Sequence, residues 1–136
     1  MKSSYQIPCG IDHLKDLRDF LGKVLNNLEL GDIDRNALIL AVDEVCANII
    51  IHSNCTESEF IDMNVIYEDH MLLFEIIDKS AKGFDINSYN EPEIQEIIRS
   101  RKKGGVGLML VKRIMDKIEV DKSKGRNICR LYKSLP

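Results

Sequence analysis

The sequence predicts an α+β fold, a two-layer α/β sandwich with helices on one face of a mixed, mainly antiparallel sheet. Apolar residues recur at helical spacing in some segments and run or alternate at strand length in others. The order of these segments is strand, helix, helix, strand, strand, loop, helix, strand, strand. No linker or internal repeat interrupts the 136 residues. We therefore expect a single domain over residues 1–136.

The first half of the chain predicts one strand and two helices, at residues 4–8, 12–28 and 32–53. Pro8 is a typical stop for the strand. Asp12 is suited to cap the first helix, and Asp32 or Asp34 to cap the second. Gly31 separates the two helices.

The second half predicts two strands, a polar segment with one short helix, a further helix and two final strands. These elements are expected at residues 60–67, 71–77, 79–103 with the short helix at 93–99, 104–116, 117–121 and 127–133. Turns at residues 68–70 and 123–125 join each pair of strands into a hairpin. The polar segment is long for a connection, and such connections are more often functional than idle.

Composition limits the classes of partner and compartment. The formal net charge of −3 argues against direct binding of nucleic acid. No segment reaches the ~20 apolar residues that span a bilayer, so we expect no membrane association. The four cysteines show no C-x-x-C pair and no metal-ligand spacing. Scattered thiols of this kind are typical of a reducing compartment, and we expect a cytoplasmic protein.

A polar stripe lies on the otherwise apolar second helix. Glu44, Asn48 and His52 follow one another at intervals of four residues and therefore share one face. Most Glu–Asn pairs at this spacing are simply solvated, but apolar flanks make that interpretation less satisfactory here. Functionally, the Asn48 oxygen suits Mg²⁺, and Glu44 can accept a proton during attack on a phosphate. His52 can equally cap or pack.

Asp78 directly follows the apolar strand at residues 71–77. A carboxylate at the end of a buried strand can accept a hydrogen bond from a ligand amine, such as that of adenine. A turn-forming aspartate is the common alternative. Gly83 follows shortly after, and its lack of a side chain permits either close approach to a ligand or a simple turn.

Glycines and lysines open the third long helix. Lys103, Gly104, Gly105 and Gly107 lie at its N-terminal end, followed by Leu108. Free N–H groups and the positive end of the helix dipole favour phosphate there. The segment is neither a P-loop nor a dinucleotide fingerprint, because no Gly-Lys-Ser/Thr sequence and no preceding strand accompany it.

These three features occur in a fixed order along the chain, at Asp43–His52, Ile76–Asp85 and Gly104–Asp116. Together they resemble the Bergerat-type ATP-binding fold of gyrase, Hsp90, histidine kinases and MutL. Within that superfamily, the chain looks most like the bacterial anti-sigma factor serine-protein kinases, and the similarity extends over nearly its whole length.

The resemblance implies ATP and Mg²⁺ as cofactors and a role for each matching residue. Glu44 would be the catalytic base, Asn48 the metal ligand and Asp78 the residue that holds adenine. The segment between Asp85 and Lys103 would be the ATP lid. The other implied nucleotide-binding positions are Gly83, Lys103, Gly104, Gly105, Gly107 and Leu108.

The resemblance also implies partners. Proteins of this kind phosphorylate a serine of an anti-sigma factor antagonist with a STAS domain, sequester a sigma factor and often form homodimers. The alternative is a regulatory module of the same fold that binds ATP weakly or not at all and only sequesters a protein partner. A sensor histidine kinase is a weaker interpretation, because the chain has no helical hairpin with a phospho-accepting histidine.

The chain departs from the family pattern after Asp78. Ser80 stands where the family has its first glycine, and Phe84 comes one residue late. Replacing a glycine that needs a positive φ costs roughly 1 kcal/mol, which predicts weakened rather than abolished nucleotide binding.

Overall fold

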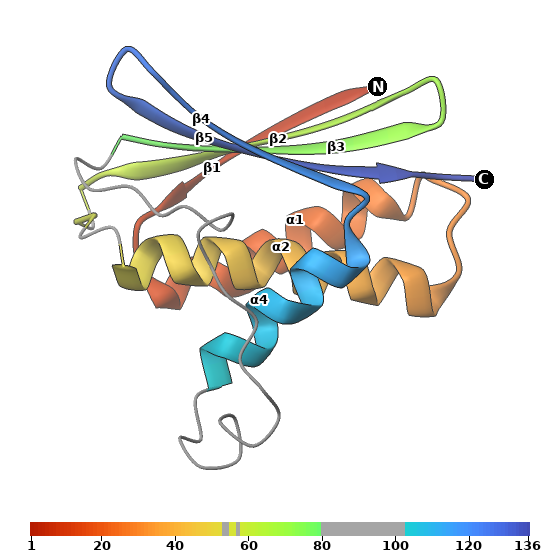
Figure 1. Cartoon of the computed structure of the whole chain (residues 1–136), viewed down its shortest axis with the longest axis horizontal. Coiled ribbons are helices and arrows are strands. Elements are labelled where there is room, and N and C mark those ends of the chain that lie inside the picture. Colours follow the sequence, from red (N-terminus) through yellow and green to blue (C-terminus); the bar gives the residue numbers. More distant parts are fainter. Residues whose placement is uncertain (53–54, 57, 80–102) are drawn as a thin grey trace.

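The structure is a computed structural model that describes residues 1–52, 55–56, 58–79 and 103–136. It confirms the two-layer α+β architecture, with one five-stranded sheet and a layer of helices on one of its faces (Figure 1). The elements are β1 (Lys2–Pro8), a 3₁₀ turn (Ile11–His13), α1 (Leu14–Leu25), α2 (Asp32–His52), β2 (Phe60–Glu68), β3 (Met71–Asp78), α4 (Lys103–Ile114), β4 (Lys117–Ser123) and β5 (Arg126–Ser134).

The strand order in the sheet is β1-β2-β3-β5-β4, and all four pairings among the described strands are antiparallel. The described sheet is thus antiparallel throughout, where a mixed, mainly antiparallel one was expected. β3, the most apolar strand, lies at the centre. Its Phe74 is fully buried, opposite Val65 of β2 and Leu131 of β5. The apolar run at 71–77 therefore forms the middle of the core.

Two tight turns close the hairpins where the sequence predicts them. Asp69 and His70 both have positive φ, as do Lys124 and Gly125 in the second hairpin. Two consecutive residues with positive φ are typical of type I′ turns, whose twist matches that of the paired strands. The strands on either side are thereby held in the register that buries alternate side chains.

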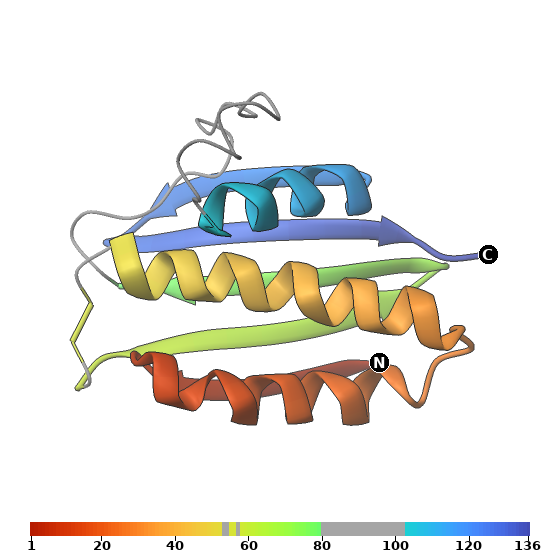
Figure 2. The same cartoon turned by 90° about the horizontal axis from the view of Figure 1, so that it is seen from below.

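The helices α1, α2 and α4 lie beside one another across the same face of the sheet (Figure 2). Leucines at helical spacing on α1 point into the core, and Leu17, Leu21 and Leu25 are fully buried. α2 begins at Asp32, close to the predicted start, but Asp32 and Asp34 both lie within its first turn, and the Gly31 carbonyl accepts the hydrogen bond from Arg35 N–H, so neither aspartate is the cap that was predicted. The residues Glu44 and Asn48 of α2 and the glycines at the start of α4 therefore belong to the same layer.

Asp12 does not cap the first helix as predicted. It lies within the 3₁₀ turn, and the N-cap residue of α1 is His13. Gly10 precedes the 3₁₀ turn and His13 precedes α1. Within the described part of the chain, no side-chain hydrogen bond caps either element. The prediction was wrong because a 3₁₀ turn takes up the residues that α1 was expected to begin with.

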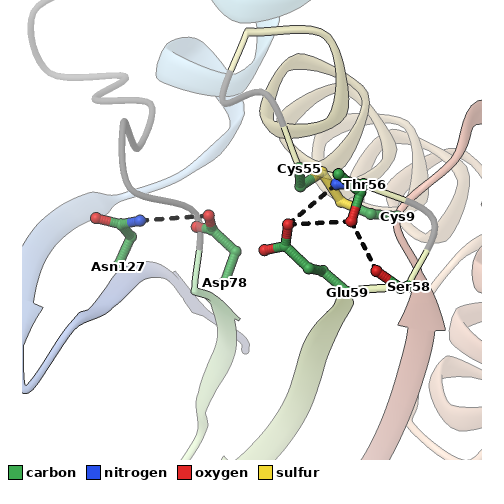
Figure 3. Close-up of a disulfide and its surroundings, with 7 residues drawn as sticks. All are labelled: Cys9, Cys55, Thr56, Ser58, Glu59, Asp78 and Asn127. Carbon is green, nitrogen blue, oxygen red and sulfur yellow. Dashed lines mark hydrogen bonds between the residues drawn. A yellow bond between two sulfur atoms is a disulfide. The ribbon is translucent and has the colours of Figure 1, made fainter.

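Cys9 and Cys55 form a disulfide, whereas the sequence was interpreted as having only scattered thiols (Figure 3). The two residues are 46 positions apart, and they meet because the end of β1 lies beside the segment that follows α2. Cys46 and Cys129 are buried and are not part of a disulfide. Among the described residues, no helix is long and apolar enough to cross a bilayer.

Candidate nucleotide-binding site

The C-terminal half of α2 places Glu44 and Asn48 one helical turn apart, as their spacing predicts. Asn48 is only 5% exposed, and its Nδ2 donates a hydrogen bond to the backbone carbonyl of Glu44 at 2.8 Å. This bond uses the amide nitrogen. The side-chain oxygen of Asn48 is then the atom that is chemically suited to a hard metal ion.

Glu44 reaches from α2 to α4, where its carboxylate lies against Gly107. A Cβ atom built at position 107 would overlap the Glu44 carboxylate and lie 2.8 Å from its Cγ. α2 and α4 are neighbours in the helical layer (Figure 2). The structure therefore brings together the polar stripe and the glycine-rich helix, two features that are far apart in the sequence.

Burial raises the pKa of the Glu44 carboxyl, and the charge of neighbouring Asp43 raises it further. Burial also raises the pKa of Asp43, although the ion pair with Arg18 of α1 works in the opposite direction. The Arg18–Asp43 contact measures 3.1 Å between Nη1 and Oδ1. A carboxylate with a raised pKa is a better proton acceptor near neutral pH, which suits Glu44 to the role of a general base.

The raised pKa of Glu44 predicts a pH dependence of stability. The folded state binds more protons than the unfolded state once the pH exceeds the ordinary value of 4.5, so the free energy of unfolding falls as pH rises toward the folded pKa. We expect Glu44→Gln to remove this contribution. The free energy of unfolding of Glu44→Gln minus that of the parental protein should therefore increase as the pH is raised.

Urea unfolding of both proteins between about pH 4 and pH 8 measures this difference. Asp43 is present in both proteins, so the difference reports Glu44 together with its electrostatic coupling to Asp43. A difference that stays constant over the whole range would contradict a raised pKa at Glu44.

Asp78 is the last residue of β3 and is only 3% exposed. In the register of the sheet it lies directly opposite Asn127 of β5, whose Nδ2 donates a hydrogen bond to Asp78 Oδ2 at 3.3 Å (Figure 3). A buried carboxylate with one oxygen oriented in this way is a strong acceptor for a ligand amine. Asp78 is thus a buried, hydrogen-bonded carboxylate rather than an exposed one at the surface.

Sequence reasoning missed Asn127. It is buried on the face of β5 that packs against the helices, where Cys129 and Leu131 follow at alternate positions. A polar residue at an inward position of an apolar strand is the signal that could have found it, because buried amides are normally hydrogen-bonded.

Cys46 is a fully buried thiol of α2. Burial is the main cause that raises its pKa, and the charges of Asp43 and Asp78 contribute.

Some of the remaining predicted positions lie among the described residues and others do not. Lys103, Gly104 and Gly105 form the first turn of α4, which confirms a helix entry there, and Leu108 is buried in the core. Gly83, Ser80, Phe84, the short helix at 93–99 and the expected lid lie outside the described residues. His52 is the exposed last residue of α2.

The described residues fit Mg²⁺ and a nucleotide. No group of three or more His, Cys, Asp or Glu side chains in the described ranges could hold a metal by itself. Mg²⁺ is commonly held by one or two protein oxygens together with the oxygens of a bound phosphate. Asn48 can supply such an oxygen and Asp78 an acceptor for an amine. The N-terminus of α4 can offer backbone N–H groups to phosphate, as helix N-termini generally do.

Comparison with known families and proteins agrees with this geometry. The model of the histidine kinase-like ATPase domain matches residues 7–133. The serine-protein kinase RsbW of Halalkalibacterium halodurans is 26% identical over 124 residues, which cover 88% of this chain and 75% of the relative. RsbW of Bacillus cereus is 23% identical over 132 residues, which cover 93% and 81%. Both relatives are named as serine-protein kinases, which agrees with the resemblance of the sequence to that branch of the superfamily.

Solved structures share the fold. The RsbU and RsbW domains of a Mycobacterium tuberculosis protein superpose with a TM-score of 0.69 at 14% identity, over 99% of this chain and 32% of that longer one. The SiaB–SiaC complex of Pseudomonas aeruginosa gives 0.69 at 12% identity, over 96% and 88%. Because the family model covers nearly all of the sequence, this chain belongs to the histidine kinase-like ATPase domain family.

Proposed function

We propose that this chain is a Mg-ATP-dependent serine-protein kinase and anti-sigma factor, acting as one ATP-binding domain over residues 1–136. The observation that carries the proposal is the Glu44 carboxylate, which lies between α2 and the glycine-rich entry of α4 with Asn48 one turn away. A module that only sequesters a partner has no need of a base in this position. The names of the RsbW relatives support the same activity.

Asp78 would bind the adenine amine. Its burial removes competing water, and the hydrogen bond from Asn127 orients one carboxylate oxygen. A charged acceptor in such a site forms a stronger hydrogen bond than a neutral one. Gly83, which follows Asp78 in the sequence, would allow the chain to pass close to the base.

Asn48 would hold Mg²⁺ through its side-chain oxygen, and the first turn of α4 would bind the phosphates. Lys103, Gly104 and Gly105 belong to that turn. Lys103 would add positive charge there, and the two glycines would place no side chain between the N–H groups and a phosphate. Leu108, buried beneath the turn, would anchor it to the core. Bound Mg-ATP supplies the phosphoryl group for transfer.

Glu44 would act as the general base. The serine hydroxyl of the protein substrate would lose its proton to the Glu44 carboxylate as its oxygen bonds to the γ-phosphorus, while the bond from that phosphorus to the β,γ-bridging oxygen breaks and ADP leaves. Burial and the charge of Asp43 raise the pKa of Glu44 and so strengthen it as a base.

The proposed partners are an anti-sigma factor antagonist with a STAS domain as the phosphorylated protein, and a sigma factor as the sequestered one, both in the cytoplasm. One structural neighbour, SiaB, is known in complex with a second protein, SiaC. The alternative is a module that sequesters its partner without phosphate transfer, and Ser80 in place of the family's first glycine favours it.

A homodimer is also part of the proposal. The sheet face away from the helices is uncovered by any described element (Figure 1). It carries a row of polar side chains in which Ser4 binds Asn64 at 2.7 Å, Asn64 binds Glu75 at 3.0 Å and Arg130 binds Glu75 at 3.1 Å. An ordered, uncovered face with both donors and acceptors suits pairing with a second copy of itself.

Titration with a fluorescent ATP analogue, with and without Mg²⁺, tests nucleotide binding. We expect saturable binding that Mg²⁺ strengthens, and Asn48→Ala should lose about 10–100-fold of the Mg²⁺-dependent affinity. Asn36→Ala is the matched control, because Asn36 is an exposed asparagine of the same helix. No saturable binding at millimolar nucleotide would contradict the proposal.

Co-purification of the tagged chain from its source organism tests the partners. We expect a STAS-domain protein that becomes phosphorylated on serine when the purified chain and Mg-ATP are added, as read by mass spectrometry. Nucleotide binding without any phosphoserine would instead favour the sequestering module.

A further inference from the structure

Gly107 provides the space that the Glu44 side chain occupies. A Cβ atom at position 107 would collide with the Oε2, Cδ and Cγ atoms of Glu44, the last at 2.8 Å. These three atoms are the nearest neighbours of that Cβ position, and all belong to one side chain. Any residue other than glycine at this position would therefore move the Glu44 carboxylate.

Backbone conformation does not explain the glycine. Gly107 lies inside α4, and Gly125 is the glycine that has a positive φ among the described residues. Glycine in the interior of a helix lowers its stability relative to alanine. Gly22 in α1 differs, because a Cβ there would meet nothing within 4 Å. The clearance around Glu44 is the physical reason for a glycine at position 107.

The family resemblance implies that Gly107 binds nucleotide. We propose instead that Gly107 is a positioning residue for Glu44 and that its contribution to phosphate transfer comes through the base rather than through nucleotide binding. The inference rests on the function proposed above. Because position 107 has no side chain, the Glu44 carboxylate can lie between α2 and α4, beside the helix entry that is proposed to bind phosphate. The position of α4 and the position of the base are thereby coupled.

Gly107→Ala tests this role. The added methyl group meets the flexible end of Glu44, so the fold is kept while the carboxylate rotates away. A displacement of about 1 Å can lower a rate about 100-fold, and we expect a loss of that order in kcat for phosphate transfer to the STAS-domain protein. The Kd for the fluorescent ATP analogue should stay close to the parental value. Gly22→Ala, the control without a neighbour, should change neither quantity.

Urea unfolding tests the contact without any nucleotide. In a Glu44→Ala background the methyl group at position 107 has room, so Gly107→Ala should raise the unfolding midpoint through its better helix propensity. In the parental background Glu44 must move, and the gain should be smaller or absent. The difference between the two changes in midpoint measures the coupling between the two residues.

The outcomes are distinguishable. A parental rate in Gly107→Ala overturns the inference, and so does a loss of nucleotide affinity that matches the loss of rate. If the parental protein transfers no phosphate, the proposed function fails, but the urea comparison still decides the contact. Equal midpoint gains in the two backgrounds would then overturn the role of Gly107, and a smaller gain beside Glu44 would support it.

Discussion

Glu44→Gln is expected to lower the rate of phosphate transfer about 10²–10⁴-fold, the usual contribution of a positioned general base. Glutamine keeps the size of the side chain and its place against Gly107, but its amide cannot accept the proton of the serine hydroxyl. Binding of nucleotide should persist, because Asp78, Asn48 and the first turn of α4 are unchanged. Transfer of radiolabelled phosphate from Mg-ATP to the STAS-domain protein measures the rate.

A second carboxylate provides the control. Glu29 is exposed in the connection between α1 and α2, so Glu29→Gln removes a negative charge without touching the site. It should retain the parental rate. If Glu44→Gln also transfers phosphate at the parental rate, Glu44 is not the base, whatever its place in the fold.

Loss of the Cys9–Cys55 disulfide is expected to lower the free energy of unfolding by up to about 4 kcal/mol. The bond joins residues 46 positions apart, and the chain-entropy model assigns roughly this value to a loop of that length. That is a large share of the ~5–15 kcal/mol that typically separates folded from unfolded domains. Urea unfolding of the parental protein with and without a thiol reductant measures the effect.

The double variant Cys9→Ser/Cys55→Ser should unfold at the midpoint of the reduced parental protein and should not respond to reductant. Counting thiols in the denatured, unreduced chain gives an independent answer. Two reactive thiols out of the four cysteines are expected, from Cys46 and Cys129. Four reactive thiols, or a midpoint that reductant leaves unchanged, would show that the bond does not form in solution.

The effect of the disulfide should be strongest where α2 leads into β2. Cys9 N–H donates a hydrogen bond to the Glu59 carbonyl at 2.9 Å. The backbone N–H and the hydroxyl of Thr56 both donate to the Glu59 carboxylate at 3.2 Å (Figure 3). These contacts hold the connection against the end of β1. Local opening there leaves Glu44 and Asn48 in place, because both lie at least one helical turn before the end of α2.

Local spacing was enough to find some features. Residues Ile61, Met63 and Val65 alternate with polar neighbours, and this pattern predicted the strand β2, in which the structure buries these three side chains. The interval between Glu44 and Asn48 predicted a shared helix face in the same way, because the period of a helix is set by local geometry. Both turns with positive φ were likewise visible as short polar breaks.

Other features depend on which residues meet after folding. The expected cap at Asp12 was wrong because a 3₁₀ turn precedes α1. The thiols of Cys9 and Cys55 showed no motif, since their spacing along the chain says nothing about their distance in space. Asn127 was not identified, because its importance comes from lying opposite Asp78 in the sheet register.

The sequence by itself determined the α+β class, the helical stripe of Glu44 and Asn48, the buried strand that ends in Asp78 and the glycine-rich helix entry. Periodicity and chain order carry that information. The tertiary structure alone decided that Glu44 rests on Gly107, that Asn127 orients Asp78 and that Cys9 joins Cys55. Each of these is a contact between distant segments, and side-chain packing across the helical layer and hydrogen-bond register across the sheet determine which segments meet.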